Sequence, residues 1–559
     1  MSKEYATTAT PVTTSTSGTH RPGFGGKVSR IVGRVFGRQD IDTLHAAIAH
    51  IEYKKTLTAL DLTLLGIGAI IGAGIFVLTG VAAAKHAGPA LVISFLIAGF
   101  VCGLASLCYA EMGSMVPASG SAYTFTYVAL GEGLAWICGW DLMLEYMVGA
   151  ATVAVGWSHY LQNFITQVAG EGAYNHRFTM APFKWYEVGD KDRGIPSESA
   201  HFGLNTFRCG GTDEAPEFCN PYIDLPAIAI VIMVTALLVF GIRSSARVNS
   251  VLVALKVTVV LMFIFAGLKF INKANYVPFI PPEEGPKKYG VSGVFAGAVT
   301  VFFAYIGFDA VSTTAQEAKN PQRDLPIGII GSLTICTALY VAVAAVLSGL
   351  LPLKRIAEAD VMSAPVSQAL LIAAQGQGVN LKWLTIIITI AAIAGLSSVI
   401  LVMLMGQPRI FAAMAKDGLL PAVFAKMHPK YGTPYVTTLT TGFITMLFAG
   451  LLPVDILGNL TSVGTLLAFF FVSASTLVLK ITQPLRPRPF QIPGGKIGGF
   501  AVPILSMASV IFLLSQTTPA AISRVFIWMA LGTLIYLFYG YRHSKNRFDP
   551  ARTLHHVDM

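Results

Sequence analysis

Charged residues are scarce in this chain. Asp, Glu, Lys and Arg make up 12% of its 559 residues, whereas soluble domains average about 25%. Hydrophobic residues make up 54%, and the mean hydropathy is +0.64. So few charges cannot cover a water-facing surface, which excludes a soluble enzyme and a disordered protein. The composition instead indicates a protein that crosses a membrane many times.

Cysteine is sparse as well. The chain has six cysteines, too few and too scattered for a secreted disulfide scaffold. The four that fall inside apolar runs are Cys102, Cys108, Cys138 and Cys336. Cys209 and Cys219 share the one long polar loop, and we expect them to form a disulfide on an oxidising side of the membrane. Two free thiols are the alternative.

Several sequence signatures are missing. No G-x-x-x-x-G-K-[ST] nucleotide-binding loop occurs, which argues against an ATP-driven pump. Only His159 of eleven histidines lies within an apolar run, whereas a haem-carrying membrane oxidoreductase needs paired intramembrane histidines. The net charge of +10 comes without a dense basic cluster, so nucleic acid is not an expected partner. We predict no enzyme activity, no metal and no organic cofactor.

Twelve apolar runs are long enough to cross a bilayer as helices, which takes about 20 residues. They lie near 57–80, 89–113, 131–161, 225–242, 251–270, 291–313, 326–351, 383–405, 434–452, 458–481, 501–516 and 521–540. The sequence therefore predicts an all-α polytopic membrane protein with twelve spans. The third run is too long for a perpendicular span, so it is expected to tilt or to project from the membrane.

Basic residues predict the orientation of these spans. With the N-terminus inside, eleven Lys and Arg residues fall in short cytoplasmic loops and seven in short external loops, as the positive-inside rule requires. The tails 1–56 and 541–559 are then cytoplasmic, and the loop 162–224 is external. We expect a multi-pass protein of the plasma membrane, or of the inner membrane if the chain is bacterial.

Glycine interrupts two of the spans. The first reads GIGAIIGAGIF at 66–76, and the sixth reads FFAYIGFDA at 302–310. Glycine costs roughly 1 kcal/mol relative to alanine in a helix, so these clusters indicate close helix packing or an unwound stretch. The two spans open successive groups of five, and five is odd, so the second group enters the membrane from the opposite side. Interrupted spans at matching positions of inverted halves indicate a transporter binding site.

Unwinding also indicates what such a site binds. It frees backbone N–H groups at half-helix N-termini, which carry partial positive charge and suit a carboxylate. Freed carbonyl groups suit an ammonium. Both ends of a zwitterion can therefore be held by backbone, which favours a transporter. A channel or a receptor-like sensor is the remote alternative.

Five motifs, in order, resemble the cationic amino acid transporter family of the amino acid–polyamine–organocation superfamily. They are GIGAIIGAGIFVLTG (66–80), GWDLMLEY (139–146), FFAYIGFDAVS (302–312), EAKNPQRDLPIGI (317–329) and GQPRIFAAMAKDGLLP (406–421). The resemblance covers residues from about 50 to 540. It implies a leucine-transporter-like five-plus-five inverted repeat, in 57–270 and 291–481, followed by two helices in 501–540. It also implies an amino acid bound between helices one, three, six and eight.

The resemblance assigns residues to this site. Those implied to hold the substrate carboxylate are Ile70, Gly72, Ala73 and Gly74. Those implied to receive the amino group are Phe303, Ala304 and Ile306. Tyr305 and Phe308 are implied to shape or gate the pocket.

Four acidic residues add candidates. Glu145 lies about 21 Å along the third span, and Asp141 lies one turn earlier on the same face. Carboxylates at that depth are functional candidates, although a protonated Glu145 bonded to a neighbouring helix is the alternative. Asp309 either orders the broken turn or caps the following half-helix. Glu317 belongs either to a cytoplasmic gate or to a solvated loop.

Met403 bears on the choice of substrate. By resemblance it stands in helix eight where arginine-carrying members have a small polar residue. A cationic side chain needs oxygen atoms at the far end of the pocket, whereas methionine fills space and is only a weak acceptor. We therefore expect a small neutral L-amino acid. The alternative keeps Glu145 as the partner of arginine, lysine or ornithine, carried by uniport or symport.

Lys256 bears on coupling. It lies about eight residues into the fifth span, further than a lysine comfortably snorkels. By resemblance it stands where related sodium-coupled carriers bind a cation between helices one, five and eight. We expect Lys256 to replace that ion and a proton to be the coupling ion. The alternative is a fixed charge that braces helix one in a uniporter. The sequence does not specify the oligomeric state, and a monomer would suffice.

Overall fold

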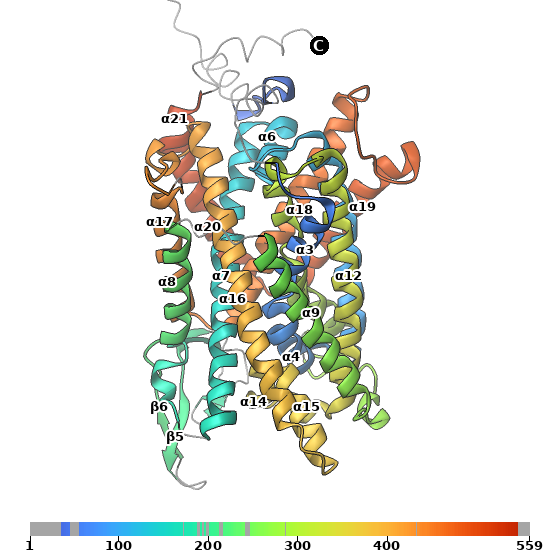
Figure 1. Cartoon of the computed structure of the whole chain (residues 1–559), viewed down its shortest axis with the longest axis vertical. Helices are drawn as coiled ribbons and strands as arrows, with labels where there is room; N and C mark the ends of the chain where they lie inside the picture. The colour runs from blue at the N-terminus through green and yellow to red at the C-terminus, as the bar shows by residue number, and fades with distance from the viewer. Residues whose placement is uncertain are drawn as a thin grey trace, which may run out of the picture.

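The computed structural model describes residues 35–44, 55–170, 173–186, 191–192, 195–196, 201–211, 216–240, 246–285, 287–431 and 433–545. Within them the chain folds as a bundle of roughly parallel helices with short β-strands at one end (Figure 1). Most of the predicted tails 1–56 and 541–559 lies outside the described residues.

The bundle contains long helices and short helical turns. The long ones are α3 (Ala59–Ile70), α5 (Leu91–Met115), α7 (Glu132–Ala169), α8 (Leu225–Val239), α9 (Ala246–Leu268), α10 (Gly290–Phe302), α12 (Pro321–Leu350), α16 (Lys382–Lys416), α17 (Tyr435–Leu451), α18 (Val454–Thr482), α19 (Gly495–Gln516) and α20 (Pro519–Ile535). The short ones used below are η1 (Gly74–Leu78), α4 (Thr79–Ala82), η2 (Ala83–Ala87), α6 (Ala122–Leu130), η6 (Phe303–Tyr305), α11 (Phe308–Thr313), η7 (Ala315–Glu317), α15 (Pro365–Gly376) and α21 (Tyr541–His543).

Helices occupy all twelve apolar runs that the sequence predicts. In the described part of the chain, eight helical segments are long and apolar enough to cross a membrane, and α8 and α17 are shorter apolar helices. One of the eight, Ala59–Met115, spans two predicted runs. The all-α fold is thus confirmed, and the count of twelve spans stays a prediction.

The helix that contains the third predicted run extends beyond the end of that run. α7 has 38 residues and continues to Ala169, eight residues into the predicted loop. Polar side chains on this extension are buried and bonded: Gln162 donates to the Ser158 hydroxyl at 3.0 Å and to the Thr179 carbonyl oxygen at 2.8 Å. Because these groups find partners within the protein, the helix does not need to end where the apolar run ends.

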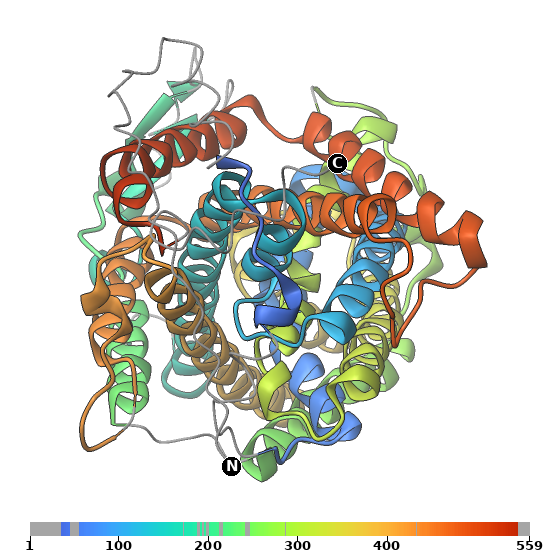
Figure 2. The same cartoon turned by 90° about the horizontal axis from the view of Figure 1, so that it is seen from above.

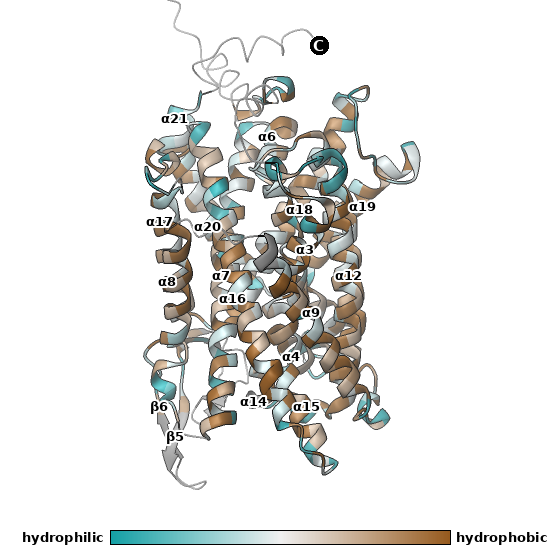
Figure 3. Ribbon diagram, viewed as in Figure 1, coloured by the Kyte–Doolittle hydropathy of each residue, from teal (hydrophilic) through white to brown (hydrophobic). Residues whose placement is uncertain are grey.

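The outer surface of the bundle suits a lipid environment. Figure 3 shows hydrophobic residues along helices such as α8 and α12, with hydrophilic residues gathered toward the two ends of the molecule. Large apolar side chains are exposed there, such as Phe265 and Val251 on α9, each 68% exposed. An apolar surface of this extent marks a membrane contact.

Packing places the interrupted helices in the interior. α3 packs against α9 and α12, and α7 packs against α16 and α18. The C-terminal helices α19 and α20 run along the edge of the bundle when it is seen from above (Figure 2), and they are among the least buried of the candidate spans. They are therefore more peripheral in the bundle than the helices between 59 and 482.

In the described part of the polar loop after α7 there are three two-stranded antiparallel sheets. Their strands are β1 (Phe183–Tyr186) with β4 (His201–Leu204), β2 (Lys191–Asp192) with β3 (Ile195–Pro196), and β5 (Phe207–Gly211) with β6 (Pro216–Cys219). Figure 1 places β5 and β6 beyond the lower end of the helices, whereas α21 lies at the upper end. We call these two ends the strand end and the tail end.

Candidate functional site

The first glycine-rich segment is a break in a helix. α3 starts with a capping box in which the side chains of Thr58 and Asp61 bond each other's backbone N–H groups, and it ends at Ile70. Ile71 is extended (φ −71°, ψ 97°), and the helix resumes at Gly74 in the π-helical turn η1. The chain thus crosses the interior as two helical pieces.

The second glycine-containing segment is a break as well. α10 ends at Phe302, η6 makes one 3₁₀ turn, and Ile306 is extended (φ −61°, ψ 136°). Gly307 has φ 121°, a conformation that residues with a side chain rarely adopt. The helix resumes as α11.

The two breaks touch each other. A Cβ atom built on Gly74 would lie 2.1 Å from the Cα atom of Ala304, and one built on Gly307 would lie 2.8 Å from the backbone carbon of Ala69. Only glycine allows such an approach. Close packing and unwinding, which the sequence offers as alternatives, therefore occur together.

The tail ends of the two interrupted helices are also joined. The Leu57 N–H donates to the Glu317 carbonyl oxygen at 3.0 Å, and the Lys319 N–H donates to the Leu57 carbonyl oxygen at 2.8 Å. These bonds form a short parallel bridge between the start of α3 and the residues after η7. The two interrupted helices are consequently linked at their breaks and at one end.

The first break offers donors rather than acceptors. Among the described backbone bonds between elements, none uses the N–H groups of Gly72, Ala73 or Gly74, which open the second helical piece and lack intrahelical partners. The nearby carbonyl of Ile70 already accepts the hydroxyl of Tyr340 at 2.7 Å. The free N–H groups suit an anionic group, whereas the carbonyl groups of Gly68 and Ile71 are bonded to the Lys256 ammonium.

The second break offers acceptors. The Phe303 carbonyl accepts the Ile306 N–H at 3.2 Å. Within the described residues, no backbone bond between elements uses the carbonyls of Ala304 or Ile306. Such free carbonyl groups suit an ammonium. The roles that the resemblance implies for these residues stay predictions.

The two predicted aromatic residues pack on different neighbours. The Tyr305 hydroxyl donates to the Phe95 carbonyl oxygen at 2.7 Å, and the Tyr305 ring meets those of Phe95 and Tyr340 edge-on. Phe308 packs edge-on against Tyr109, with 5.5 Å between ring centroids. Both are fully buried. Their packing favours shaping the pocket over gating it.

Lys256 is fully buried and bonds to the first break. Its ammonium donates to the carbonyl oxygens of Gly68 at 2.6 Å and Ile71 at 3.1 Å. Its stem lies against Gly395 of α16, where a Cβ would lie 3.1 Å from the lysine Cγ. The charge therefore lies between α3, α9 and α16, the helices that the resemblance numbers one, five and eight.

Three carboxyl groups are buried on the tail side of the breaks. Asp309 accepts the hydroxyl of Tyr146 at 2.7 Å and the N–H of Gly307 at 3.1 Å, so it caps the second break and ties it to α7. Glu145 and Asp141 are 1% and 0% exposed. No hydrogen bond to the carboxyl oxygens of Asp141 is found among the described residues. The side chain of Thr465 on α18 acts on the Glu145 carboxyl group, so the bond to a neighbouring helix stays an alternative for Glu145.

Met403 fills space between helices. It is 4% exposed, and its sulfur lies so close to α7 that a Cβ on Gly149 would be 3.1 Å away. The next glycine contact along α16 is Gly406, which lies against the ring of Tyr146. Met403 is thus placed on the face of α16 that meets α7.

Glu317 takes part in an ion pair, and its side chain is 32% exposed. Its carboxylate accepts from Arg409 of α16 at 2.8 Å, and Arg409 also donates to the Thr313 carbonyl oxygen at 3.3 Å. This pair closes the tail end of the second interrupted helix against α16. The arrangement favours the predicted gate network.

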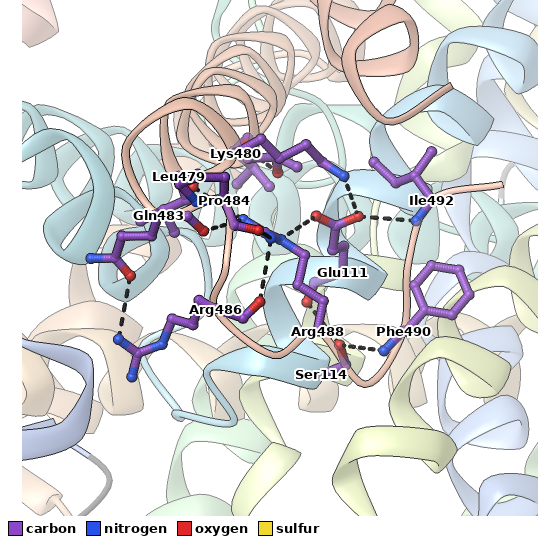
Figure 4. Close-up of polar contacts among 12 residues, drawn as sticks. Glu111, Ser114, Leu479, Lys480, Gln483, Pro484, Arg486, Arg488, Phe490 and Ile492 are labelled. Carbon is purple, nitrogen blue, oxygen red and sulfur yellow. Dashed lines mark hydrogen bonds and ion pairs between the residues drawn. The ribbon is translucent and has the colours of Figure 1, made fainter. Parts of the chain in front are cut away.

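One buried charge network was missed by the sequence analysis. Glu111, near the end of α5, is 1% exposed and pairs with Lys480 at 2.8 Å and Arg488 at 3.2 Å. It also accepts the Ile492 N–H at 3.0 Å. Figure 4 shows these groups converging on the Glu111 carboxylate from the last turn of α18 and from the segment that follows it.

Arg488 extends this network to the end of α18. It donates to the carbonyl oxygens of Leu479 and Gln483, at 3.1 Å each, at the negative end of the helix dipole. Each of these oxygens also accepts a backbone N–H. Sequence position alone suggests an interfacial Glu111. The signal that was available is the run PLRPRPFQIP (484–493), whose two arginines follow a span without any acidic residue nearby.

The predicted disulfide is only partly described. Cys219, at the end of β6, is disulfide-bonded, and β6 pairs with the strand that carries Cys209. The side chain of Cys209 lies outside the described residues, so the pairing stays a prediction. The four cysteines of the apolar runs are free and buried.

Comparison with known proteins identifies the family. The family model for amino acid permeases matches residues 57–538. The branched-chain amino acid permease BcaP of Bacillus subtilis is 42% identical over 523 residues, which cover 92% of this chain and 99% of that protein. The methylthioribose transporter of the same organism is 38% identical over 511 residues, covering 91% and 98%.

A more distant relative carries the predicted family name. Human cationic amino acid transporter 4 is 34% identical over 439 residues, covering 78% of this chain and 62% of that protein. The predicted resemblance is confirmed, and these relatives are named as transporters and permeases. The chain belongs to the amino acid permease family and is a membrane transporter, not an enzyme.

Proposed function

We propose that the protein carries a small neutral L-amino acid across the membrane by alternating access. The observation that carries this proposal is the contact between the two helix breaks. The N–H groups of Gly72, Ala73 and Gly74 lie in one break and the carbonyl groups of Ala304 and Ile306 in the other, and none of them is used in a described backbone bond between elements. Such a pair of half-sites complements the carboxylate and the ammonium of one zwitterion.

The proposal includes the architecture that alternating access needs. Residues 57–270 and 291–481 form two inverted halves of five spans, and the helices in 501–540 follow as a separate pair. By the distribution of basic residues, the tail end is cytoplasmic and the strand end is external. Two linked interrupted helices then move against α7 and α16 around a fixed site.

A neutral substrate is favoured by the surroundings of Met403. Its thioether takes up room between α16 and α7 and offers only a weak acceptor. BcaP, the relative with 42% identity, is named for branched-chain amino acids, which are neutral. The buried Glu145 supports the second candidate, a cationic amino acid, for which several more distant relatives are named.

A proton is proposed as the coupling ion. The Lys256 ammonium holds the carbonyls of Gly68 and Ile71 with no acidic partner on it among the described contacts. Loss of its proton would weaken both bonds and release the first break. In this proposal, protonation of Lys256 is linked to the position of α3.

Competition for uptake tests the substrate class. Purified protein in proteoliposomes should take up radiolabelled L-alanine saturably and show counterflow from preloaded vesicles. Unlabelled serine, glycine and valine should compete better than arginine or lysine. Competition by arginine at concentrations where serine has no effect would replace the neutral substrate with the cationic one. An ohmic conductance without counterflow would contradict transport by alternating access.

A further inference from the structure

Residues 35–44, ahead of α3 in the chain, lie across the tail end of the bundle. Figure 1 shows this dark-blue segment at the top of the molecule beside α6, and Figure 2 shows it over the middle of the bundle. Ile41 within it is 1% exposed and belongs to the apolar core. The segment is therefore docked on the helices, and we call it the N-terminal strap.

One part of the strap is seated on the start of α7. The Glu132 N–H donates to the Gly37 carbonyl oxygen at 3.0 Å. A Cβ atom built on Gly131 would lie 2.7 Å from the backbone carbonyl carbon of Phe36, and Gly131 has φ 102°, which residues with a side chain rarely adopt. A glycine at this corner thus makes room for the strap.

Another part of the strap reaches the segment after α18. Asp42 forms an ion pair with Arg486 of that segment, and its side chain is 77% exposed. The segment is itself held on α5, because Arg488 pairs with Glu111 at 3.2 Å. The strap therefore connects the start of α7 with a segment that is anchored on α5.

The C-terminal residues of the described chain meet the same corner of α7. The Glu132 carboxylate accepts the hydroxyl groups of Tyr536 and Ser544. The Lys545 N–H donates to the carbonyl oxygen of Asp417, at the end of α16, at 3.0 Å. These contacts join α7 to α16, which are the two helices that stay fixed in the proposed cycle.

The strap spans a different pair of parts. α5 packs against α10, which leads into the second break, and against α12, which in turn packs against α3. In the proposed cycle the interrupted helices move against α7 and α16. The strap therefore runs from the fixed part of the bundle to a segment anchored on the part that moves.

We propose that the N-terminal strap is an autoinhibitory contact, which holds the tail end closed and has to be released before the site opens there. An exposed ion pair contributes little stability, so the Asp42 contact can break and re-form within each transport cycle. The proposal rests on the alternating access of the proposed function and is independent of which amino acid is carried.

Ser312→Cys provides a reporter of the tail end. Ser312 lies on α11 and is 0% exposed, and its hydroxyl contacts that of Ser121, at the start of α6, at 2.6 Å. A thiol at this position should react with a maleimide when the tail end opens. The rate of labelling is measured in detergent, and the protein without this substitution gives the background from the native cysteines.

Asp42→Arg tests the strap, because it replaces the attraction to Arg486 by repulsion. On the Ser312→Cys background it should raise the rate of labelling by about two- to threefold, and the Vmax of alanine uptake should rise in the same direction. Combining Asp42→Arg with Arg486→Asp restores a pair of opposite charges, so this double variant should label at the parent rate.

Ile41→Asp releases the strap by another route, since it places a charge in the apolar core. Phe36→Asp is the matched control on the same segment, because the Phe36 side chain is 53% exposed. Ile41→Asp should label at least as fast as Asp42→Arg, and Phe36→Asp should label at the parent rate. Asp42 is exposed, so Asp42→Arg decides the question even if Ile41→Asp does not fold.

The strap is overturned if Asp42→Arg labels at the parent rate, or if adding Arg486→Asp fails to reverse a faster rate. Slower labelling of Asp42→Arg would also overturn it, because the strap would then favour the open tail end. Absence of alanine uptake by the native protein would overturn the proposed substrate, whereas the labelling comparison would still decide on the strap.

Discussion

At the scale of single residues, a buried ammonium and a buried thioether have the most specific consequences. Lys256 acts on backbone carbonyls of the first break, so its effect reaches the substrate through α3. Met403 acts by the volume that it occupies beside Gly149. Each can be changed without touching the backbone donors of the break site.

Substitution of Lys256 should separate its charge from its bonds. Lys256→Gln keeps N–H donors but has no proton to release, whereas Lys256→Ala removes both. In sodium-free proteoliposomes, an inward proton gradient should accelerate alanine uptake by the native protein only. Lys256→Gln should keep counterflow, and Lys256→Ala should lose most transport because two charge-assisted bonds of about 1.5–3 kcal/mol each are gone. Native uptake indifferent to the gradient would leave Lys256 only the bracing role.

Met403→Ser should widen the range of substrates. Removing the thioether opens room beside Gly149, so larger or cationic side chains should gain, with arginine competing about tenfold better against alanine. The matched control is Met414→Ser, because the Met414 sulfur packs in the same way against Gly139 of α7. Both changes should cost roughly 2–4 kcal/mol of stability. Equal selectivity in the two variants would show that Met403 is not in the pocket.

At the scale of elements, the ends of the helices carry the polar groups that hold the bundle together. Asp224 caps α8 by accepting the Ala227 N–H at 3.1 Å, and it accepts the Ser158 hydroxyl of α7 at 2.7 Å. The Glu111 network does the same at the tail end, where it ties α5 to the segment after α18. The carboxyl groups of Asp224 and Glu111 are both buried, so their contributions to the stability of the bundle depend on whether each is charged.

Asp224 should make the stability depend on pH. Burial raises the pKa of the Asp224 carboxyl from 3.8 to about 7, so the folded state binds this proton more tightly than the unfolded state. The resulting stability is present below about pH 4 and is lost as pH rises to about 7, by roughly 4 kcal/mol if the whole shift applies.

Asp224→Asn provides the measurement, since asparagine caps helices equally well and does not titrate. In detergent, the melting temperature of the native protein should fall between pH 5 and pH 8 relative to that of the variant. Parallel melting curves across this range would mean that Asp224 is ionised in the folded state at low pH.

Glu111→Gln should destabilise the tail end. The change leaves Lys480 and Arg488, whose side chains are 11% and 9% exposed, without their counter-charge, and removing one partner of a buried pair costs roughly 3–5 kcal/mol. Glu284→Gln is the control, because the Glu284–Lys288 pair is exposed and is expected to contribute less than about 1 kcal/mol. Thermal unfolding of both variants should differ by several degrees. Similar melting temperatures for the two variants would contradict a buried Glu111 ion pair and would mean that water solvates the Glu111 carboxylate.

At the scale of the whole molecule, the two interrupted helices form one linked unit. They contact each other at Gly74 and Gly307 and through the bridge at Leu57. Ion pairs then fasten this unit at both ends, Lys85–Asp455 at the strand end and Glu317–Arg409 at the tail end. In the proposed alternating-access cycle, we expect one of the two pairs to separate when the site opens toward that side.

The orientation of the molecule can be read from its cysteines. If the strand end is external, Cys209 and Cys219 should be bonded to each other, and a membrane-impermeant maleimide should label intact cells only after reduction. The other four cysteines are buried and free, so they should contribute little to the labelling of folded protein. Labelling at both positions without reduction would rule out the disulfide, and labelling only in opened vesicles would reverse the orientation.

The sequence by itself determined the class of fold and the location of the site. Apolar runs of span length must form helices in a bilayer, since backbone groups there need internal partners. Glycine clusters at 66–76 and 302–310 locate the breaks because glycine alone tolerates the required conformations and contacts. These signals are local, so they are legible without the tertiary structure.

Only the tertiary structure decided which distant groups meet. From its sequence position, Glu111 is expected at the membrane interface. In the structure it pairs with Lys480 and Arg488, which are more than 360 residues away in the chain. The extension of α7 past its apolar run likewise depends on the Thr179 carbonyl, beyond the end of the helix. The ion pair between Lys85 of η2 and Asp455 of α18 likewise joins residues that are far apart in the sequence. Electrostatic partners are set by proximity in space, and a single sequence records no distance between residues that its chain order separates.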